Sequence, residues 1–231
     1  MTAVSETRRI AGRVVRAGRG AASARIIASA AVRRVADPSG GVALTFDDGP
    51  DPLWTTAVLD ELARLGVCAT FFAVGRRAEE NPHLVRRILA DGHALGSHSY
   101  GHPDPWTLPV RALAADYRRG HRAVEVAAGR HVPLFRPPKG FVDVRGAIAM
   151  RLARVQPFLW TVDPHDWEPR VEAGAIRCAL EGLAGGDVVL LHDAIEGPLA
   201  PEALDRSATV AALPEIAAMA AARGLRFTTL R

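Results

Sequence analysis

Cysteine is scarce in this chain: Cys68 and Cys178 are the only two among 231 residues, and they stand far apart. Neither belongs to a CxxC pair, so the sequence offers no thiolate metal cluster, redox pair or disulfide framework. We therefore expect both cysteines to be ordinary core residues. Lysine is scarcer still, because Lys139 is the only lysine among 29 basic residues.

Long hydrophobic runs are also missing. No segment approaches the ~18 apolar residues that span a membrane. The longest uncharged apolar run near the amino terminus, residues 26–32, is enclosed by arginines and is a weak candidate for a signal peptide. We therefore predict a cytoplasmic protein, and peripheral membrane contact through the basic amino-terminal arm stays open.

Basic residues are concentrated at one end of the chain. Residues 1–36 hold eight arginines and one acidic residue, whereas residues 37–231 hold 21 basic and 24 acidic residues. The body therefore lacks the basic excess that a nucleic-acid partner requires. We predict two parts, an Arg-rich arm over residues 1–36 and one globular domain over residues 37–231. Solvation is a more common fate for such an arm than docking on anionic lipid.

Seven apolar, strand-forming segments alternate with six stretches of helical spacing. The predicted strands cover residues 42–47, 68–74, 93–97, 132–136, 157–162, 187–192 and 225–230. Helical patterns include residues 54–66 and 83–92, which end at glycines, and residues 209–224, where Pro214 marks a bend or a late start. This alternation predicts an α/β fold with a parallel sheet. Seven strands favour an incomplete (β/α) barrel over a five- or six-stranded open sheet, although periodicity alone does not decide between them.

Five of the seven predicted strands end in polar residues, where parallel α/β folds place their chemistry. Asp47 and Asp48 are adjacent, and in mid-strand one of them would point into the apolar interior. A strand end followed by the Gly49–Pro50 turn would let both carboxylates face one pocket. The polar segments are TFDDGP (45–50), HSYGH (98–102), FRPPKG (135–140), VDPHDW (162–167) and LLHD (190–193).

His98 and His102 lie four residues apart, so a helical turn would bring both imidazoles to one face, where they could chelate an ion. The residues between them lack the glutamate of HExxH, which excludes the zinc peptidase pattern. Such a pair alone is more often structural. A strand-end carboxylate would complete a set of two histidines and one carboxylate, and this favours a metal site.

Other polar residues at the strand ends have ordinary structural explanations when they are taken singly. Arg136 precedes two prolines that hold its segment extended, and it could simply cap a surface carboxylate. Asp166 and Trp167 could be a turn acid and a core aromatic. His192 could be a structural histidine that has its hydrogen bonds satisfied.

Together, TFDDGP, HSYGH, RPPKG, DPHDW and LLH, in this order, resemble the five motifs of the NodB-type polysaccharide deacetylases, carbohydrate esterase family 4. The resemblance covers residues 41–230. It implies a distorted (β/α) barrel of about seven strands, a catalytic domain over residues 37–231, and a metal-dependent hydrolase that removes acetyl groups from glycans.

The resemblance assigns a metal site and a base. Asp48, His98 and His102 would bind one divalent ion, with Zn²⁺ expected first and Co²⁺ or Ni²⁺ as alternatives. Asp47 would be the general base that takes a proton from the attacking water, and Arg136 would orient it.

The resemblance also assigns an acid and a substrate pocket. His192 would protonate the departing amine, and Asp166 would adjust the charge of His192. Trp167 and Leu190 would line the pocket for the acetyl methyl group. The backbone N–H of Lys139 would help to hold the oxyanion.

Lys139 departs from the family pattern, which usually has tyrosine or phenylalanine there. The ammonium group replaces a ring that would cover a sugar face, and favours either an anionic group on the substrate or a small substrate. A solvated lysine at the rim explains it equally well.

The expected partner is an N-acetylated glycan: an N-acetylhexosamine unit in an oligosaccharide, a polysaccharide or a glycoconjugate. A cytoplasmic location would favour a biosynthetic intermediate. O-deacetylation of acetylated xylan, which uses the same residues, is the alternative activity. An inactive carbohydrate-binding homologue is disfavoured because every metal, base and acid position is filled.

Overall fold

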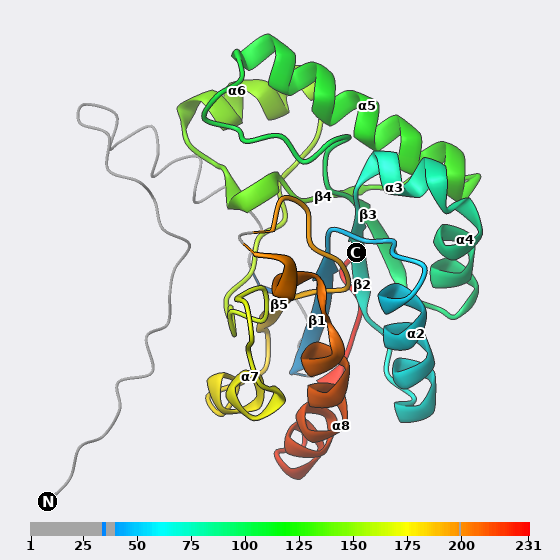
Figure 1. The fold of residues 1–231 in the computed structure, drawn as a ribbon, viewed down its shortest axis with the longest axis vertical. Coiled ribbons are helices and arrows are strands. Elements are labelled where there is room, and N and C mark those ends of the chain that lie inside the picture. Colours follow the sequence, from blue (N-terminus) through cyan, green and yellow to red (C-terminus); the bar gives the residue numbers. More distant parts are fainter. Residues whose placement is uncertain (1–33, 36–39, 199) are drawn as a thin grey trace, which may run out of the picture.

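The computed structural model describes residues 34–35, 40–198 and 200–231 (Figure 1). The arm predicted over residues 1–36 lies outside the described residues, apart from Arg34 and Val35. Among the helices that are described, none combines the length and the apolar character needed to cross a membrane.

The centre of the fold is a row of parallel strands in the order β4-β3-β2-β1-β5, and β6 pairs with the start of β1. The strands are β1 (Gly41–Asp47), β2 (Thr70–Ala73), β3 (Ala94–Ser97), β4 (Leu134–Phe135), β5 (Val188–His192) and β6 (Arg226–Phe227). Every residue of β1 is buried, as expected for a central strand covered on both faces. The predicted α/β class with a parallel sheet is confirmed.

Residues 157–162, predicted as a strand, form an extended segment without a continuous ladder. It makes two isolated parallel bridges, from Pro157 to Phe135 of β4 and from Val162 to Val189 of β5. Because β4 and β5 are the outer strands of the row, this closing segment joins the two edges into a distorted barrel. Pro157 lacks an N–H, which contributes to the broken pairing.

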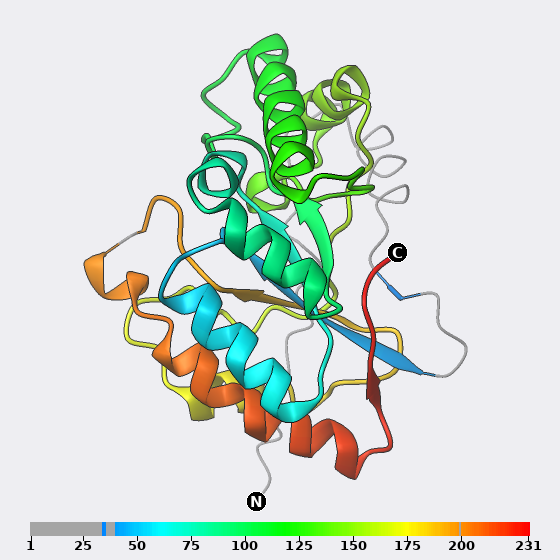
Figure 2. The same ribbon diagram turned by 90° about the vertical axis from the view of Figure 1, so that its right-hand side faces the viewer.

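Helices connect successive strands and cover the barrel. They are α2 (Trp54–Leu65), α3 (Gly75–Glu80), α4 (Pro82–Ala90), α5 (Val110–Ala128), α6 (Val144–Ala153), α7 (Ala173–Ala179) and α8 (Ser207–Ala222). Figure 2 shows α2 and α8 side by side, with α5 and α6 packed together at the other end of the molecule. As predicted, α2 ends at a glycine: Gly66 has a φ of 65°. α8 begins at Ser207, so Pro214 lies within the helix and does not mark a late start.

The main core lies between the sheet and helices α2, α4, α7 and α8. Neither cysteine belongs to it, because Cys68 and Cys178 are both exposed, and the prediction of core cysteines is wrong. On α7 the fully buried position belongs to Ile176, and Leu180 directly after the helix is buried too. Cys178 is therefore left on the outer side.

Candidate active site

The carboxyl ends of four strands bring the predicted site residues together. Asp47 is the last residue of β1 and lies in register with His192, the last residue of β5. His98 directly follows β3, and Arg136 directly follows β4. Neighbouring parallel strands end at the same edge of the sheet, and their polar side chains therefore meet in one place.

Asp48, His98 and His102 form a compact cluster of ligand atoms. Oδ1 of Asp48 lies 3.4 Å from Nε2 of His98 and 3.4 Å from Nε2 of His102. Donor atoms around a tetrahedral ion with bonds of about 2.0–2.1 Å lie about 3.3 Å apart. This Oδ1 is buried and has no hydrogen-bond partner among the described residues. A divalent ion would satisfy it, so these residues fit a metal.

The backbone of this cluster is turned rather than helical. Asp48, Ser99 and His102 have positive φ values of 75°, 68° and 49°, which are costly for residues other than glycine. The two histidines therefore meet without the helical turn that their spacing suggested. The Ser99 hydroxyl accepts a hydrogen bond from the N–H of His102, at 3.0 Å. Gly120 of α5 allows the Ser99 turn to pack directly against the helix, because a Cβ at this position would overlap the Ser99 carbonyl group.

His98 is held as a neutral imidazole. Its Nδ1–H donates to the carbonyl oxygen of Arg136 at 2.8 Å, and this leaves the lone pair of Nε2 facing Asp48. Burial lowers the pKa of His98 to about 3, and repulsion from His102 acts in the same direction. A neutral, oriented imidazole is the form that a metal requires.

Asp47 is paired with the fully buried Arg136. Oδ1 of Asp47 accepts a hydrogen bond from Arg136 at 2.7 Å. Oδ2 of Asp47 lies 3.7 Å from Nε2 of His98, next to the metal cluster. Burial raises the pKa of Asp47, and the Arg136 charge and hydrogen bond oppose that rise. The carboxylate thus lies beside the candidate metal ligands and is held in place by Arg136.

Arg136 is itself held by the barrel. It donates to the Thr45 hydroxyl at 2.8 Å and to the carbonyl oxygens of Phe158 and Leu159 at 3.0 and 3.4 Å. Its guanidinium carbon also lies 4.1 Å from the centre of the Phe72 ring. The arginine is therefore a buried structural link and not a surface cap.

His192 and Asp166 form a second pair. Nδ1–H of His192 donates to Asp166 at 2.8 Å, and the His192 backbone N–H donates to the other carboxylate oxygen at 2.9 Å. Burial lowers the pKa of His192, but Asp166, and more weakly Asp48 and Asp47, raise it to a net value of about 9. His192 is therefore charged at neutral pH and can donate a proton.

The predicted substrate residues lie on three separate segments. Leu190 is buried and opposes Thr45 two positions before His192, so it faces the same side of the sheet as His192. Trp167 is half-buried, with its ring 5.4 Å from that of His165. Lys139 lies in the short turn Pro138–Gly140 with a φ of 57°.

The surroundings of Lys139 include two residues that the motifs did not indicate. Its Nζ is 3.9 Å from Oδ2 of Asp104 and 5.5 Å from the centre of the Trp106 ring. Trp106 is 46% exposed, so a flat aromatic surface is available beside the lysine.

Three supporting residues were also missed. Thr45 could have been found, because it precedes Asp47 by two positions and so shares its strand face. Thr209 donates to the Asp166 carboxylate at 2.9 Å, and Arg206 donates to the Asp166 carbonyl at 2.6 Å. Nothing in the sequence marks these long-range partners.

Residues 34–156 match the family described as Polysaccharide deacetylase. A peptidoglycan-N-acetylglucosamine deacetylase from Bacillus cereus is 37% identical over 192 residues, which cover 82% of this chain and 85% of that protein. A chitooligosaccharide deacetylase from Azorhizobium caulinodans is 33% identical over 202 residues, covering 85% and 96%. The structure of a family 4 carbohydrate esterase from Streptomyces lividans in complex with acetate aligns with a TM-score of 0.72 and 33% identity, covering 83% and 93%.

The barrel and these matches define a carbohydrate-active hydrolase. The chain belongs to the polysaccharide deacetylase family, carbohydrate esterase family 4. The family, the barrel fold and the hydrolase class predicted from the five motifs are thereby confirmed.

Proposed function

We propose that this protein removes the acetyl group from N-acetylglucosamine units of a polysaccharide or oligosaccharide, releasing acetate and a free amine. One observation carries the proposal: the buried Oδ1 of Asp48, which no hydrogen bond satisfies within the described part of the chain, faces two histidine nitrogens at 3.4 Å, with a separate base and acid beside it. The B. cereus relative is named as a peptidoglycan-N-acetylglucosamine deacetylase and the A. caulinodans relative as a chitooligosaccharide deacetylase, and these names favour an amide over the O-acetyl ester of xylan.

Asp48, His98 and His102 would hold one divalent ion, of which Zn²⁺ suits a set of two nitrogens and one oxygen. Such an ion would lower the pKa of a coordinated water and polarise the acetyl carbonyl. Asp47 is held by Arg136 at 2.7 Å and would not be needed as a ligand, so its carboxylate would be free to accept the proton of the attacking water. Adjacent carboxylates thus have different roles.

His192 would supply the proton that the leaving amine requires. Its charge is maintained by Asp166, whose carboxylate in turn accepts a hydrogen bond from Thr209. The proton lost by water and the proton gained by the amine therefore pass through separate residues on neighbouring strands.

The substrate would be held at the rim of the site. The Lys139 backbone N–H would donate to the oxyanion, and Leu190 and Trp167 would contact the acetyl methyl group. Trp106 offers the flat surface that a tyrosine or phenylalanine at position 139 would otherwise supply. Asp104 partly neutralises the Lys139 ammonium, which weakens the case for an anionic substrate.

The test compares two variants of the adjacent carboxylates. Asp48→Ala should bind metal weakly, and added Zn²⁺ should restore part of its activity. Asp47→Asn keeps the size of the side chain but cannot accept a proton, so its metal content should stay normal while turnover falls by ~10²-fold or more.

Acetate release is measured on N-acetylated chitooligosaccharides, peptidoglycan and acetylated xylan, alongside metal analysis. Loss of metal from Asp47→Asn would contradict the division of roles. Release from xylan alone would establish the O-acetyl esterase instead, and no release from any substrate with metal bound would favour an inactive binding protein.

A further inference from the structure

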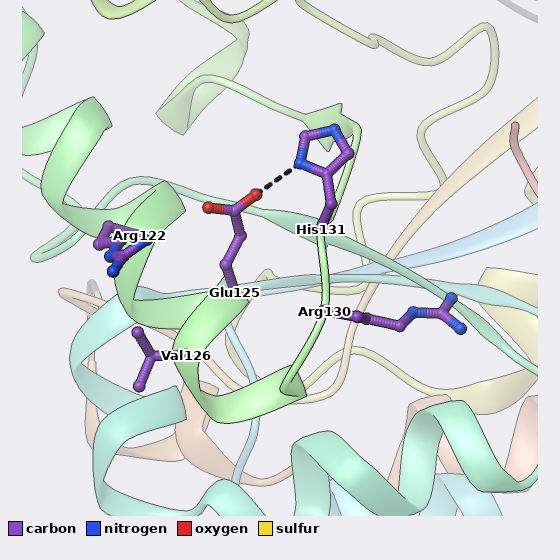
Figure 3. A pocket seen from close by; sticks show the side chains of 5 residues that line it. All are labelled: Arg122, Glu125, Val126, Arg130 and His131. Carbon is purple, nitrogen blue, oxygen red and sulfur yellow. Dashed lines mark hydrogen bonds and ion pairs between the residues drawn. The ribbon is translucent and has the colours of Figure 1, made fainter.

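A second group of ligand-type side chains lies outside the active site. His121 and Glu125 are one turn apart on α5, and His131 follows the end of that helix at Gly129. One ligand atom from each lies within 4.8 Å of the others. We call these three residues the α5 cluster. Figure 3 shows Glu125 and His131 facing each other beside a surface hollow.

The spacing within the α5 cluster is close to that of a metal site. Oε1 of Glu125 lies 2.6 Å from Nδ1 of His131 and 3.8 Å from Nε2 of His121. These distances lie on either side of the separation of about 3.3 Å expected for neighbouring ligands of a tetrahedral ion. A small side-chain rotation would therefore bring three donors onto one ion.

His121 is oriented by a second contact, as metal-ligating histidines usually are. Its Nδ1 lies 2.9 Å from the Ser97 hydroxyl, and this leaves Nε2 directed at Glu125. Burial lowers the pKa of His121. The side chain of His131 is 75% exposed, which leaves the cluster open to ions from solvent.

We propose that His121, Glu125 and His131 bind a second divalent transition-metal ion of the Zn²⁺ type, with solvent completing the coordination. Two imidazoles and one carboxylate suit Zn²⁺ and do not suit Mg²⁺ or Ca²⁺. Arg122 and Arg130 line the same hollow and oppose a cation by charge. The Arg130 side chain extends away from the Glu125–His131 pair (Figure 3), so the ligands, and not the net charge, would supply the affinity.

The ion would fasten the turn after α5 to the helix itself and, through His121, to Ser97 at the end of β3. Its role is structural, since no member of the α5 cluster touches the reacting groups. The alternative explanation of the short Glu125–His131 distance is an ion pair that binds no metal.

The experiment is a Zn²⁺ titration of metal-depleted full-length protein near pH 7.5, followed calorimetrically and by metal analysis after dialysis. The wild type should bind two equivalents. His131→Ala and Glu125→Gln should each bind one and keep their acetate release. Asp48→Ala should also bind one, because it loses the other ion. His83→Ala changes an exposed histidine on α4 and should still bind two.

Two outcomes would overturn the proposal. One is a wild type that binds a single equivalent, removed by Asp48→Ala. The other is His131→Ala and Glu125→Gln proteins that still bind two. Thermal unfolding of each metal-free variant checks that its fold is intact, and a shift of the unfolding temperature with Zn²⁺ in Asp48→Ala reports the second ion without any activity measurement.

Discussion

Replacing Asp166 by asparagine should change the pH range in which the enzyme works. The amide would keep the shape of the side chain and a hydrogen-bonding oxygen, but it would remove the charge that sustains the imidazolium of His192. Burial lowers the pKa of His192, and with Asp166 neutral only the weaker effects of Asp48 and Asp47 would oppose it, so the pKa should fall from about 9 to near its ordinary value of 6.5.

The direction of the effect follows from the proposed role of His192 as an acid. An acid works only while protonated, so activity is lost as pH rises through its pKa. At pH 8, a histidine of pKa about 9 is about 90% protonated and one of pKa about 6.5 is about 3% protonated, so the variant should be about 30-fold less active. At pH 6 the same arithmetic gives less than about a 1.5-fold difference.

The assay is acetate release from an N-acetylated chitooligosaccharide between pH 5.5 and 10, with NMR titration of the His192 ring as a direct check. A divalent ion held by Asp48, His98 and His102 would lower the pKa of His192 in both proteins, so the comparison rests on the difference between them. Thr209→Val removes a hydrogen-bond donor to Asp166 but keeps the charge of Asp166. In this variant the pH at which activity falls on the alkaline side should stay nearly the same as in the wild type. If wild type and Asp166→Asn lose activity over the same alkaline pH range, the reasoning is refuted.

Three further predictions concern packing, specificity and the leaving group. Gly120→Ala should push the Ser99 turn outward, which would cost ~1–3 kcal/mol of folding stability and weaken metal binding. Gly174→Ala, where an added Cβ would meet no other atom, should change neither property. Unfolding curves and metal analysis of the two variants test this prediction. If Lys139 recognises an anionic group, Lys139→Tyr should raise kcat/KM for neutral oligosaccharides relative to anionic ones by up to about tenfold. Equal changes in kcat/KM for both substrate classes would support a solvated lysine that does not contact the substrate. His192→Ala should impair N-deacetylation more than hydrolysis of an activated aryl acetate, whose leaving group needs no proton; equal losses would argue against an acid.

Continuous apolar runs that pair along their whole length with a neighbouring strand were the easiest elements to predict. β1 and β5 lie within one residue of their predicted bounds, since both are continuous apolar runs buried in the sheet. Strands with short or broken pairing were harder: β4 keeps only Leu134 and Phe135 of a predicted five-residue strand, and residues 157–162 make only isolated bridges. Apolar composition reports burial, but it does not reveal whether a partner strand is in register.

Candidate site residues were predictable because each follows a strand, and strand ends converge. What the sequence could not supply is the chain of supporting contacts. Arg206 and Thr209 come from the region around the start of α8 and reach Asp166 across 40 and 43 positions of sequence. Trp106 lies in no motif. The α5 cluster combines a visible four-residue spacing, His121 and Glu125, with a histidine that only the turn after the helix brings near.

The closing segment has a consequence for how the enzyme matures. Arg136 crosses to the carbonyl oxygens of Phe158 and Leu159 with the same guanidinium that holds Asp47. Barrel closure and alignment of Asp47, the proposed base, therefore depend on the same side chain, and a chain whose closing segment has not docked lacks part of the support that holds Asp47 in place. For an engineer, Arg136 is a poor position at which to tune catalysis alone, because any replacement also removes the hydrogen bonds that hold the closing segment against the barrel.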